Sequence, residues 1–176
     1  MSVAVTSVDE LLALLAGGCE VFDEPDVDGL AHALQCGAIL RDEHSGDAEL
    51  AVAGLVHDIA DIAYPGDHGD HARRGAALVR PLLGTRVAHL VGAHVDAKRY
   101  LVATDPSYRA ALSPRSTATL AVQGDALDTA AVAVLSADPD LVAILTLRRA
   151  DERAKDVTAR PPALDEWRGV LEAVAQ

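Results

Sequence analysis

Apolar residues recur at helical spacing along most of the chain, and polar or proline-containing stretches separate the resulting segments. Capping residues, glycines and prolines mark the ends of these segments. Nine helices are predicted, over residues 7–17, 28–42, 48–62, 71–80, 85–103, 114–124, 128–136, 139–153 and 163–175. Their caps include Ser7, Asp47, Asp70 and Thr85, and Pro81 is expected to end the fourth helix.

The remaining stretches are predicted to be loops. Residues 19–26 are acidic and contain Pro25, residues 64–70 are rich in Gly and Asp, and residues 104–116 contain two prolines. No segment alternates apolar and polar residues as a strand does, and no internal repeat is present. The pattern predicts an all-α, single-domain bundle over residues 1–176, with a core at about 22–155 and a last helix at about 163–175.

Two predicted helices carry polar residues on their apolar faces. Val87, Leu90 and Val91 form an apolar stripe that His94 continues, and Lys98 follows on the same face. In the helix over 139–153, the apolar face that begins at Leu141 and Ile144 is continued by Arg148 and Asp151. These polar side chains are therefore expected to be buried or to line a cavity.

Composition narrows the classes of function. The chain has 176 residues, half of them hydrophobic, and a net charge of −12. Nucleic-acid binding is not expected, because such proteins present a basic surface. Cys19 and Cys36 lack metal-site spacing, and a disulfide is not expected. No apolar run reaches eighteen residues and no basic leader begins the chain, so we expect a cytoplasmic protein without membrane contact.

Six residues could together hold metal: His32, His57, Asp58, His71, His94 and Asp151. The His57-Asp58 doublet lies in an apolar run, where an ionisable pair is costly unless a metal or an ion partner neutralises it. Each residue also has an ordinary alternative, a core histidine with one hydrogen bond or an aspartate in an ion pair. His44, His68 and His89 are assigned that ordinary role, and His68 is the main rival of His71.

The order H…HD…H…H…D on successive helices resembles the HD-domain superfamily of metal-dependent phosphohydrolases and oxygenases. His71 followed by Gly75-Ala76 is similar to the H-x-x-x-G-A helix start of that superfamily, which favours His71 over His68. By donor type alone, iron, manganese and zinc remain open.

A narrower resemblance is to the PhnZ-type dioxygenases, which cleave 1-hydroxyalkylphosphonates and are similar in fold to the all-α, two-iron HD bundle of myo-inositol oxygenase. It covers roughly residues 22–155. The stretches that carry it are His32-Ala33-Leu34-Gln35, His94-Val95-Asp96-Ala97-Lys98-Arg99-Tyr100-Leu101, Leu112-Ser113-Pro114-Arg115-Ser116 with Gln123-Gly124, and Leu147-Arg148-Arg149-Ala150-Asp151 with Ala154-Lys155.

The resemblance implies that the six donors ligate two irons, an Fe(II)/Fe(III) pair bridged by Asp58, with dioxygen as co-substrate. It also implies that Lys98, Ser116 and Arg148 hold the phosphonate, and Asp58 and Lys98 are assigned as catalytic. Helical spacing independently places Lys98 beside His94 and Arg148 beside Asp151, where a cation suits an anionic ligand. The alternative is that both cations pair with local carboxylates.

The chain departs from this family in two places. Phe22 stands where the family often has a tyrosine, and it cannot ligate iron. Glu24, close by, is a candidate contact for a substrate amine; alternatively, Phe22 is core and Glu24 is solvated. Asp61 follows Asp58 by three residues, where the family has histidine or lysine.

The predicted function is oxidative cleavage of the C–P bond of a small 1-hydroxyalkylphosphonate to phosphate and a carboxylate. One alternative is a metal-dependent phosphohydrolase acting on a nucleotide or a small phosphate ester. Another is a non-catalytic protein that binds a small anion. The expected partner is a small anionic substrate, and the oligomeric state is left open.

Overall fold

The computed structural model describes residues 4–24, 26–66 and 69–176, without the side chains of residues 22–24. Its α-helices are α1 Val8–Ala16, α2 Gly29–Glu43, α3 Ala48–Val56, α4 Ile59–Ala63, α5 His71–Thr104, α6 Pro106–Ala111, α7 Pro114–Val122, α8 Thr129–Ser136, α9 Leu141–Arg153 and α10 Arg168–Val174. Short 3₁₀ helices cover Gly17–Glu20 (η1) and Leu164–Trp167 (η2). The prediction of one all-α domain is confirmed.

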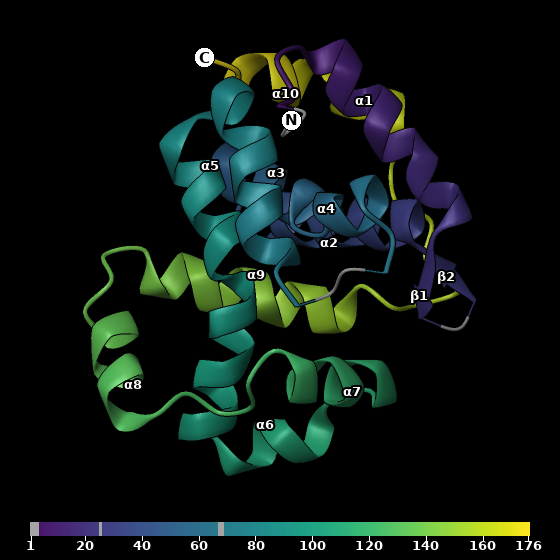
Figure 1. Ribbon diagram of the computed structural model, residues 1–176. Coiled ribbons are helices and arrows are strands. Elements are labelled where there is room, and N and C mark those ends of the chain that lie inside the picture. The colour runs from purple at the N-terminus through teal and green to yellow at the C-terminus, as the bar shows by residue number, and fades with distance from the viewer. Residues whose placement is uncertain (1–3, 25, 67–68) are drawn as a thin grey trace.

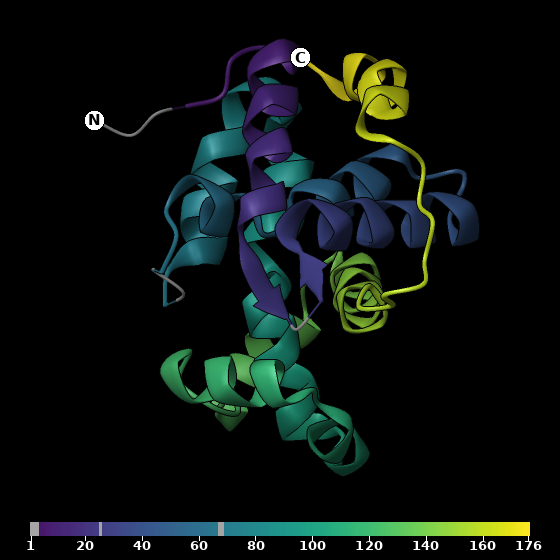
Figure 2. The ribbon, with the colours of Figure 1, turned by 90° about the vertical axis from the view of Figure 1, so that its right-hand side faces the viewer.

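Helix α5 is kinked at Gly84, and its first part folds back beside its second part, so that His71 and His94 meet. The second part runs the length of the molecule, and α9 crosses it (Figure 1). Helices α1 and α10 lie at the end of the molecule where α5 is kinked, and α6 and α7 lie at the opposite end, after the C-terminus of α5 (Figures 1 and 2). The main core, which includes Leu11, Leu40, Val52, Leu147 and Trp167, is formed chiefly by α1, α2, α3, α5, α9 and the C-terminal helical segment. A second, small core joins the end of α5 to α6 and α7.

Several predicted caps form as expected. Glu10 N donates to Ser7 Oγ at 3.2 Å, and Leu50 N donates to Asp47 Oδ1 at 3.0 Å. Asp70 does occupy the position before α5, but among the described residues its carboxylate pairs with Arg73 and caps no backbone N–H. The predicted start of α5 at His71 is therefore correct, but the predicted capping role of Asp70 is not.

The prediction of one continuous helix over 48–62 is wrong at its most important point. Helix α3 ends at Val56 and α4 begins at Ile59, so the His57-Asp58 doublet lies in a break between them. Asp58 has φ −101° and ψ 18°, outside the helical region. No glycine or proline lies at this break, and both side chains there face residues of other helices, His57 facing His32 and Asp58 facing His71.

Three proline-based boundaries also differ. The predicted break between the helices over 71–80 and 85–103 exists, but it lies at Gly84, where φ is +78°, and not at Pro81, which is still helical. Pro106 starts α6 in a stretch predicted to be irregular, because Asp105 caps it by accepting from Ser107 N and Tyr108 N. Pro139 precedes α9 instead of lying in its first turn.

The acidic loop contains a small antiparallel hairpin, β1 Phe22–Glu24 and β2 Val27–Asp28, although no strand is predicted there. Two strands this short lack a period-2 signal.

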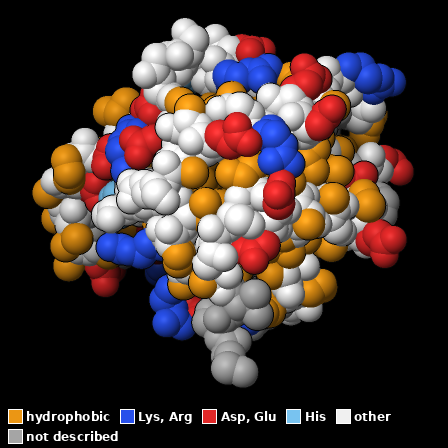
Figure 3. All heavy atoms as spheres, turned by 90° about the horizontal axis from the view of Figure 1, so that it is seen from above, with side chains coloured by type: hydrophobic (Ala, Val, Ile, Leu, Met, Phe, Trp, Pro, Cys, Tyr) orange, Lys and Arg blue, Asp and Glu red, His pale blue; other side chains and the backbone are white. Residues whose placement is uncertain are grey.

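The surface seen from above carries acidic and basic side chains interspersed with apolar ones (Figure 3). Within the described part of the chain, no single helix has the length and apolarity needed to cross a membrane. The α8–α9 pair meets that test only jointly and is bent by 109°.

Candidate metal centre and adjoining cavity

The six predicted metal donors converge from four parts of the fold. His32 comes from α2, His57 and Asp58 from the break between α3 and α4, His71 and His94 from α5, and Asp151 from α9. They form two groups, His32 with His57 and Asp151, and Asp58 with His71 and His94. In each group, three potential ligand atoms lie within 4.8 Å of one another.

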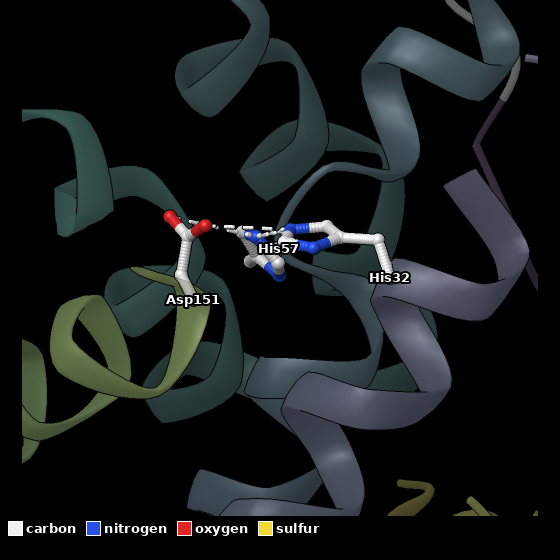
Figure 4. A group of neighbouring side chains, drawn as sticks. All are labelled: His32, His57 and Asp151. Atoms are coloured by element: carbon white, nitrogen blue, oxygen red, sulfur yellow. Dashed lines mark hydrogen bonds and ion pairs between the residues drawn. The ribbon is translucent and has the colours of Figure 1, made fainter. Parts of the chain in front are cut away.

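In the first group, the side chains of His32, His57 and Asp151 point toward one another (Figure 4). His32 Nε2 lies 3.2 Å from His57 Nε2 and 3.3 Å from Asp151 Oδ1. Asp151 Oδ2 lies 3.8 Å from His57 Nε2. Two imidazoles and one carboxylate thus face a common point.

The second group is built around Asp58. Its Oδ1 lies 3.4 Å from His71 Nε2 and 3.3 Å from His94 Nε2, and these two nitrogens are 3.0 Å apart. Its Oδ2 faces the other group, at 3.3 Å from His57 Nε2 and 3.7 Å from His32 Nε2. One carboxylate therefore presents one oxygen to each histidine pair, as a ligand that bridges two metals would.

Backbone carbonyls set the orientation and tautomer of three of these rings. The Nδ1–H groups of His32, His57 and His94 donate to Ala154 O at 2.8 Å, Gly54 O at 2.8 Å and Val91 O at 2.6 Å. Each neutral ring then directs the lone pair of Nε2 into the site, which is the usual arrangement of metal-binding histidines. Lone pairs that face each other at about 3 Å repel unless a proton or a metal cation lies between them.

The electrostatics favour carboxylates that stay charged. Burial opposes ionisation of Asp58 and Asp151, but facing histidines lower the pKa of Asp58, and Arg148 together with His32 lowers that of Asp151, both well below their usual range. Burial lowers the pKa of His94 to about 4, so this ring is neutral at pH 7. For His57, burial favours the neutral ring, yet Asp58 raises its pKa well above the usual value. A proton on His57 thus occupies the place that a metal cation would take.

A cavity of about 80 Å³ adjoins the donors and is lined by five of the six, all except His57. Lys98 and Ser116, which also line it, are only 3% and 5% exposed. Lys98 Nζ donates to Thr119 Oγ1 at 2.9 Å and to Ser116 O at 3.4 Å. Both acceptors are uncharged, so the alternative that Lys98 pairs with a local carboxylate is not supported within the described residues.

Arg148 lines the same cavity, but here the alternative holds in part. Its guanidinium contacts the carboxylates of Asp151 and Glu152, while Nε donates to Tyr108 Oη at 2.7 Å and Nη2 to Ser116 Oγ at 3.3 Å. Arg148 therefore joins a metal-donor group to the predicted phosphonate-binding residues.

The sequence interpretation missed some residues of this site. Thr119 on α7 and Gln123, the residue that follows α7, line the cavity about one and two helical turns after Ser116, so helical spacing could have indicated them. Gln123 lies in a stretch that carries the family resemblance, but no role in the site is predicted for it. Glu152 follows Arg148 by four residues on α9, a spacing that favours an ion pair. No sequence signal predicts the contact between Tyr108 and Arg148, which are 40 residues apart.

Other candidates lie outside this cluster or outside the described part. His89, which is exposed, pairs with the partly buried Asp138 at 2.9 Å, and His44 is exposed at the end of α2. His89, Asp138 and Asp140 form a third possible donor group. Arg86 already pairs with it, because its Nε donates to Asp140 Oδ1 at 3.1 Å. The side chains of Phe22 and Glu24 and the whole of His68 are not described, so the predictions on them stay predictions.

Comparisons with known proteins agree with this geometry. The HD domain family matches residues 29–147. A 1-hydroxy-2-(trimethylamino)ethyl phosphonate dioxygenase (glycine-betaine-forming) of Leisingera caerulea is 33% identical over 159 residues, which are 86% of this chain and 79% of the relative. A hydroxymethylphosphonate dioxygenase of Gimesia maris is 28% identical over 175 residues, 94% of this chain and 87% of the relative.

An uncharacterized protein of the Acanthamoeba polyphaga mimivirus is 26% identical over 167 residues, 88% of this chain and 74% of the relative. The family match covers more than half of the chain, and the two named dioxygenases align over most of it. With the two His/Asp groups, which indicate a binuclear metal site, these similarities lead to one conclusion. The chain belongs to the HD domain family and is related to its phosphonate dioxygenases.

Proposed function

We propose that this protein is an iron-dependent dioxygenase that cleaves the C–P bond of a small 1-hydroxyalkylphosphonate. The reaction consumes one dioxygen and yields a carboxylate, hydrogen phosphate and a proton. The observation that carries the proposal is the division of Asp58 between two histidine pairs beside a cavity that also holds Lys98, Ser116 and Arg148. The similarity to two proteins named as phosphonate dioxygenases supports this choice of substrate.

The metal pair would be held by His32, His57 and Asp151 on one side and by His71 and His94 on the other, with Asp58 shared. When bound as Fe(II)/Fe(III), it would supply the redox chemistry with dioxygen. A set of four imidazoles and two carboxylates suits iron, and its small number of anionic ligands leaves charge for an anionic substrate.

The chain itself would bind and orient the substrate. Lys98 has no carboxylate partner among the described residues and would contribute a positive charge to the phosphonate head. The Arg148 guanidinium would add a directed N–H donor from the side of Asp151. The apolar side chains of Val21, Val27 and Ile62 line the same cavity and would exclude water from the reacting carbon.

The substrates in the names of the two relatives differ in one group on the hydroxyl-bearing carbon. This group ends in a cationic trimethylamino group in the first substrate and is a hydrogen atom in the second. We propose Glu24, the acidic residue that the sequence suggests for this role, as the residue that meets a cationic end, since opposite charges attract strongly in a poorly hydrated site. Comparing both substrates in wild type and Glu24→Gln tests this point. Unchanged relative kcat/KM values would remove Glu24 from the site.

The test of the proposed function is oxygen consumption together with phosphate release by iron-loaded protein. We expect both with a 1-hydroxyalkylphosphonate, and no phosphate release without oxygen. Lys98→Ala and Arg148→Ala should impair this turnover far more than they reduce iron content. A paramagnetic-resonance spectrum of protein purified without added metal would report the iron pair independently.

The second candidate function is metal-dependent hydrolysis of a nucleotide or another phosphate ester. It is favoured by the same bridged donor set, because two metals also activate water and stabilise a leaving oxygen. Phosphate release that proceeds equally well without oxygen, or vigorous nucleotide hydrolysis, would replace the dioxygenase proposal with this one.

A further inference from the structure

Glu152 contacts three donor groups that could otherwise bind an anionic ligand. Its Oε1 accepts from Ser116 Oγ at 2.8 Å and contacts the Arg148 guanidinium, and its Oε2 lies 3.7 Å from Lys155 Nζ. Ser116, Arg148 and Lys155 all line the cavity, whereas Glu152 lies behind them with its side chain 17% exposed. A carboxylate of this chain therefore draws three cavity-lining groups toward itself.

The contact with Glu152 uses the hydroxyl proton of Ser116 that a ligand would otherwise accept. The Ser116 hydroxyl has one proton, which it donates to Glu152, while its oxygen accepts from Arg148 Nη2 and from Lys155 Nζ at 3.1 Å. In this arrangement the hydroxyl has no proton left for an anion in the cavity. Ser116 becomes a donor to a ligand only when its bond to Glu152 breaks.

The same count applies to Arg148. Of its five N–H groups, Nε–H is used by Tyr108, one Nη1–H by Asp151, and both Nη2–H groups by Ser116 and Glu152. Only one Nη1–H is left over. Tyr108 and Asp151 already fix the plane of the guanidinium, so Glu152 is not needed to orient it.

The charges lead to the same conclusion. Arg148 and Lys155 contribute two positive charges, and their neighbours Asp151 and Glu152 contribute two negative ones. Removal of Glu152 would take away one of the negative charges that face Arg148 and Lys155 beside the cavity. In a poorly hydrated site the loss of that negative charge favours binding of an anion.

We infer that Glu152 is an internal counter-anion that competes with the substrate anion for Ser116, Arg148 and Lys155, and so determines how tightly the site holds a phosphonate or phosphate group. The inference rests on the proposed function, because it takes the ligand to be an oxyanion. It assigns Glu152 the opposite effect from a carboxylate that merely positions its partners.

The test is calorimetric titration of metal-loaded protein with inorganic phosphate, which needs no turnover. Glu152→Gln keeps the size of the side chain and removes its charge, and we expect phosphate to bind about tenfold more tightly. The matched control is Glu172→Gln, the same change at a side chain that is 58% exposed on α10, which should leave the affinity unchanged. Circular dichroism and metal content establish that each variant is folded and loaded.

Two further measurements are independent of that variant. Glu152→Asp keeps the charge but withdraws the carboxylate by one methylene, and should give a smaller gain. In a Ser116→Ala background, Glu152→Gln should gain less than it does in wild type, because one of the contested donors is gone. In turnover, Glu152→Gln should lower both the KM for hydroxymethylphosphonate and the inhibition constant of phosphate.

Equal or weaker phosphate binding by Glu152→Gln would overturn the inference and assign Glu152 a positioning or structural role. Absence of measurable binding to both wild type and Glu152→Gln would overturn it as well. The proposed function fails separately: if phosphate release is independent of oxygen but Glu152→Gln still binds phosphate more tightly, the counter-anion stands and the dioxygenase does not.

Discussion

At the scale of single residues, Asp58 has the most consequential position in the molecule. It is the one donor whose two oxygens face different histidine pairs, at 3.3 Å from His57 and 3.3 Å from His94. A bridging carboxylate holds both metals, whereas each histidine holds one. Loss of Asp58 should therefore affect the whole centre.

We predict that Asp58→Ala loses both metals, while His94→Ala loses mainly one. The cause is the shared carboxylate, whose removal leaves two separate, weaker sites with mutually repelling cations. Metal content measured by mass spectrometry after loading and desalting checks this. Two metals retained by Asp58→Ala would show that this carboxylate is not the bridge.

Lys98 provides a second prediction at this scale, on pH. Burial, and secondarily the nearby Arg148, lowers the pKa of Lys98 to about 7, below the value it has in the unfolded chain. Its positive charge is therefore present below about pH 7 and lost above it. The unfolded chain keeps that proton longer, so Lys98 makes the ligand-free protein more stable as pH rises from about 7 toward the ordinary lysine pKa.

Anion binding should follow the charge and not the stability. We expect sulfate, which does not titrate in this range, to bind more weakly at pH 9 than at pH 6. Lys98→Arg should remove most of that difference, since arginine stays protonated. Titration of both proteins at the two pH values is the measurement, and an identical pH dependence would assign the effect to another group.

At the scale of helices, close packing of α2 against α3 places the metal donors. A Cβ at Gly54 would lie 2.5 Å from Leu40 Cδ1 and 3.3 Å from Cys36 Sγ, so any larger residue requires the buried side chain of Leu40 to shift. The carbonyl of Gly54 also accepts the Nδ1–H of His57. The same residue thus sets the helix separation and the orientation of a metal donor.

We predict that Gly54→Ala lowers the free energy of unfolding by about 1–3 kcal/mol through overpacking, and weakens metal binding through His57. Gly169→Ala on α10 is the control, because nothing lies within 4 Å of its added methyl group, and there alanine should stabilise by up to about 1 kcal/mol. Urea unfolding with and without metal measures both effects. A Gly54→Ala protein as stable as wild type would mean that α2 and α3 separate without cost.

At the scale of the whole molecule, the centre ties together segments far apart in sequence. Donors from α2, α5, α9 and the α3–α4 break meet in the interior, and each of these helices contributes to the main core. Bound metal would neutralise Asp58 and Asp151 and the repelling histidine lone pairs. Metal should therefore contribute to global stability as well as to chemistry.

We predict that chelation of the metals lowers stability by about 3 kcal/mol, the value expected when metal is present at about 100 times its dissociation constant. For a chain of this length, this corresponds to a fall in Tm of roughly 6–12 °C. Thermal unfolding of loaded and chelated protein checks it. Asp58→Ala serves as the control, because its Tm should not respond to the chelator.

The local sequence determined much of this protein. Helical spacing predicts most of the α-helices, Ser7 and Asp47 cap where expected, and the ordered donors with the family resemblance point to the HD bundle. These features are local because helix periodicity and capping depend on residues three or four positions apart. Burial of Lys98, Arg148 and Asp151 also follows from their positions on apolar faces.

Tertiary structure decided the rest. Ile59 and Ala60 continue a helical pattern, so no local signal predicts the break that directs Asp58 between two histidine pairs. The contacts of Tyr108 with Arg148 and of Glu152 with Ser116 join residues 40 and 36 positions apart. Such pairs form only when helices pack, because the free energy of burying a charged group depends on which partners the fold brings to it.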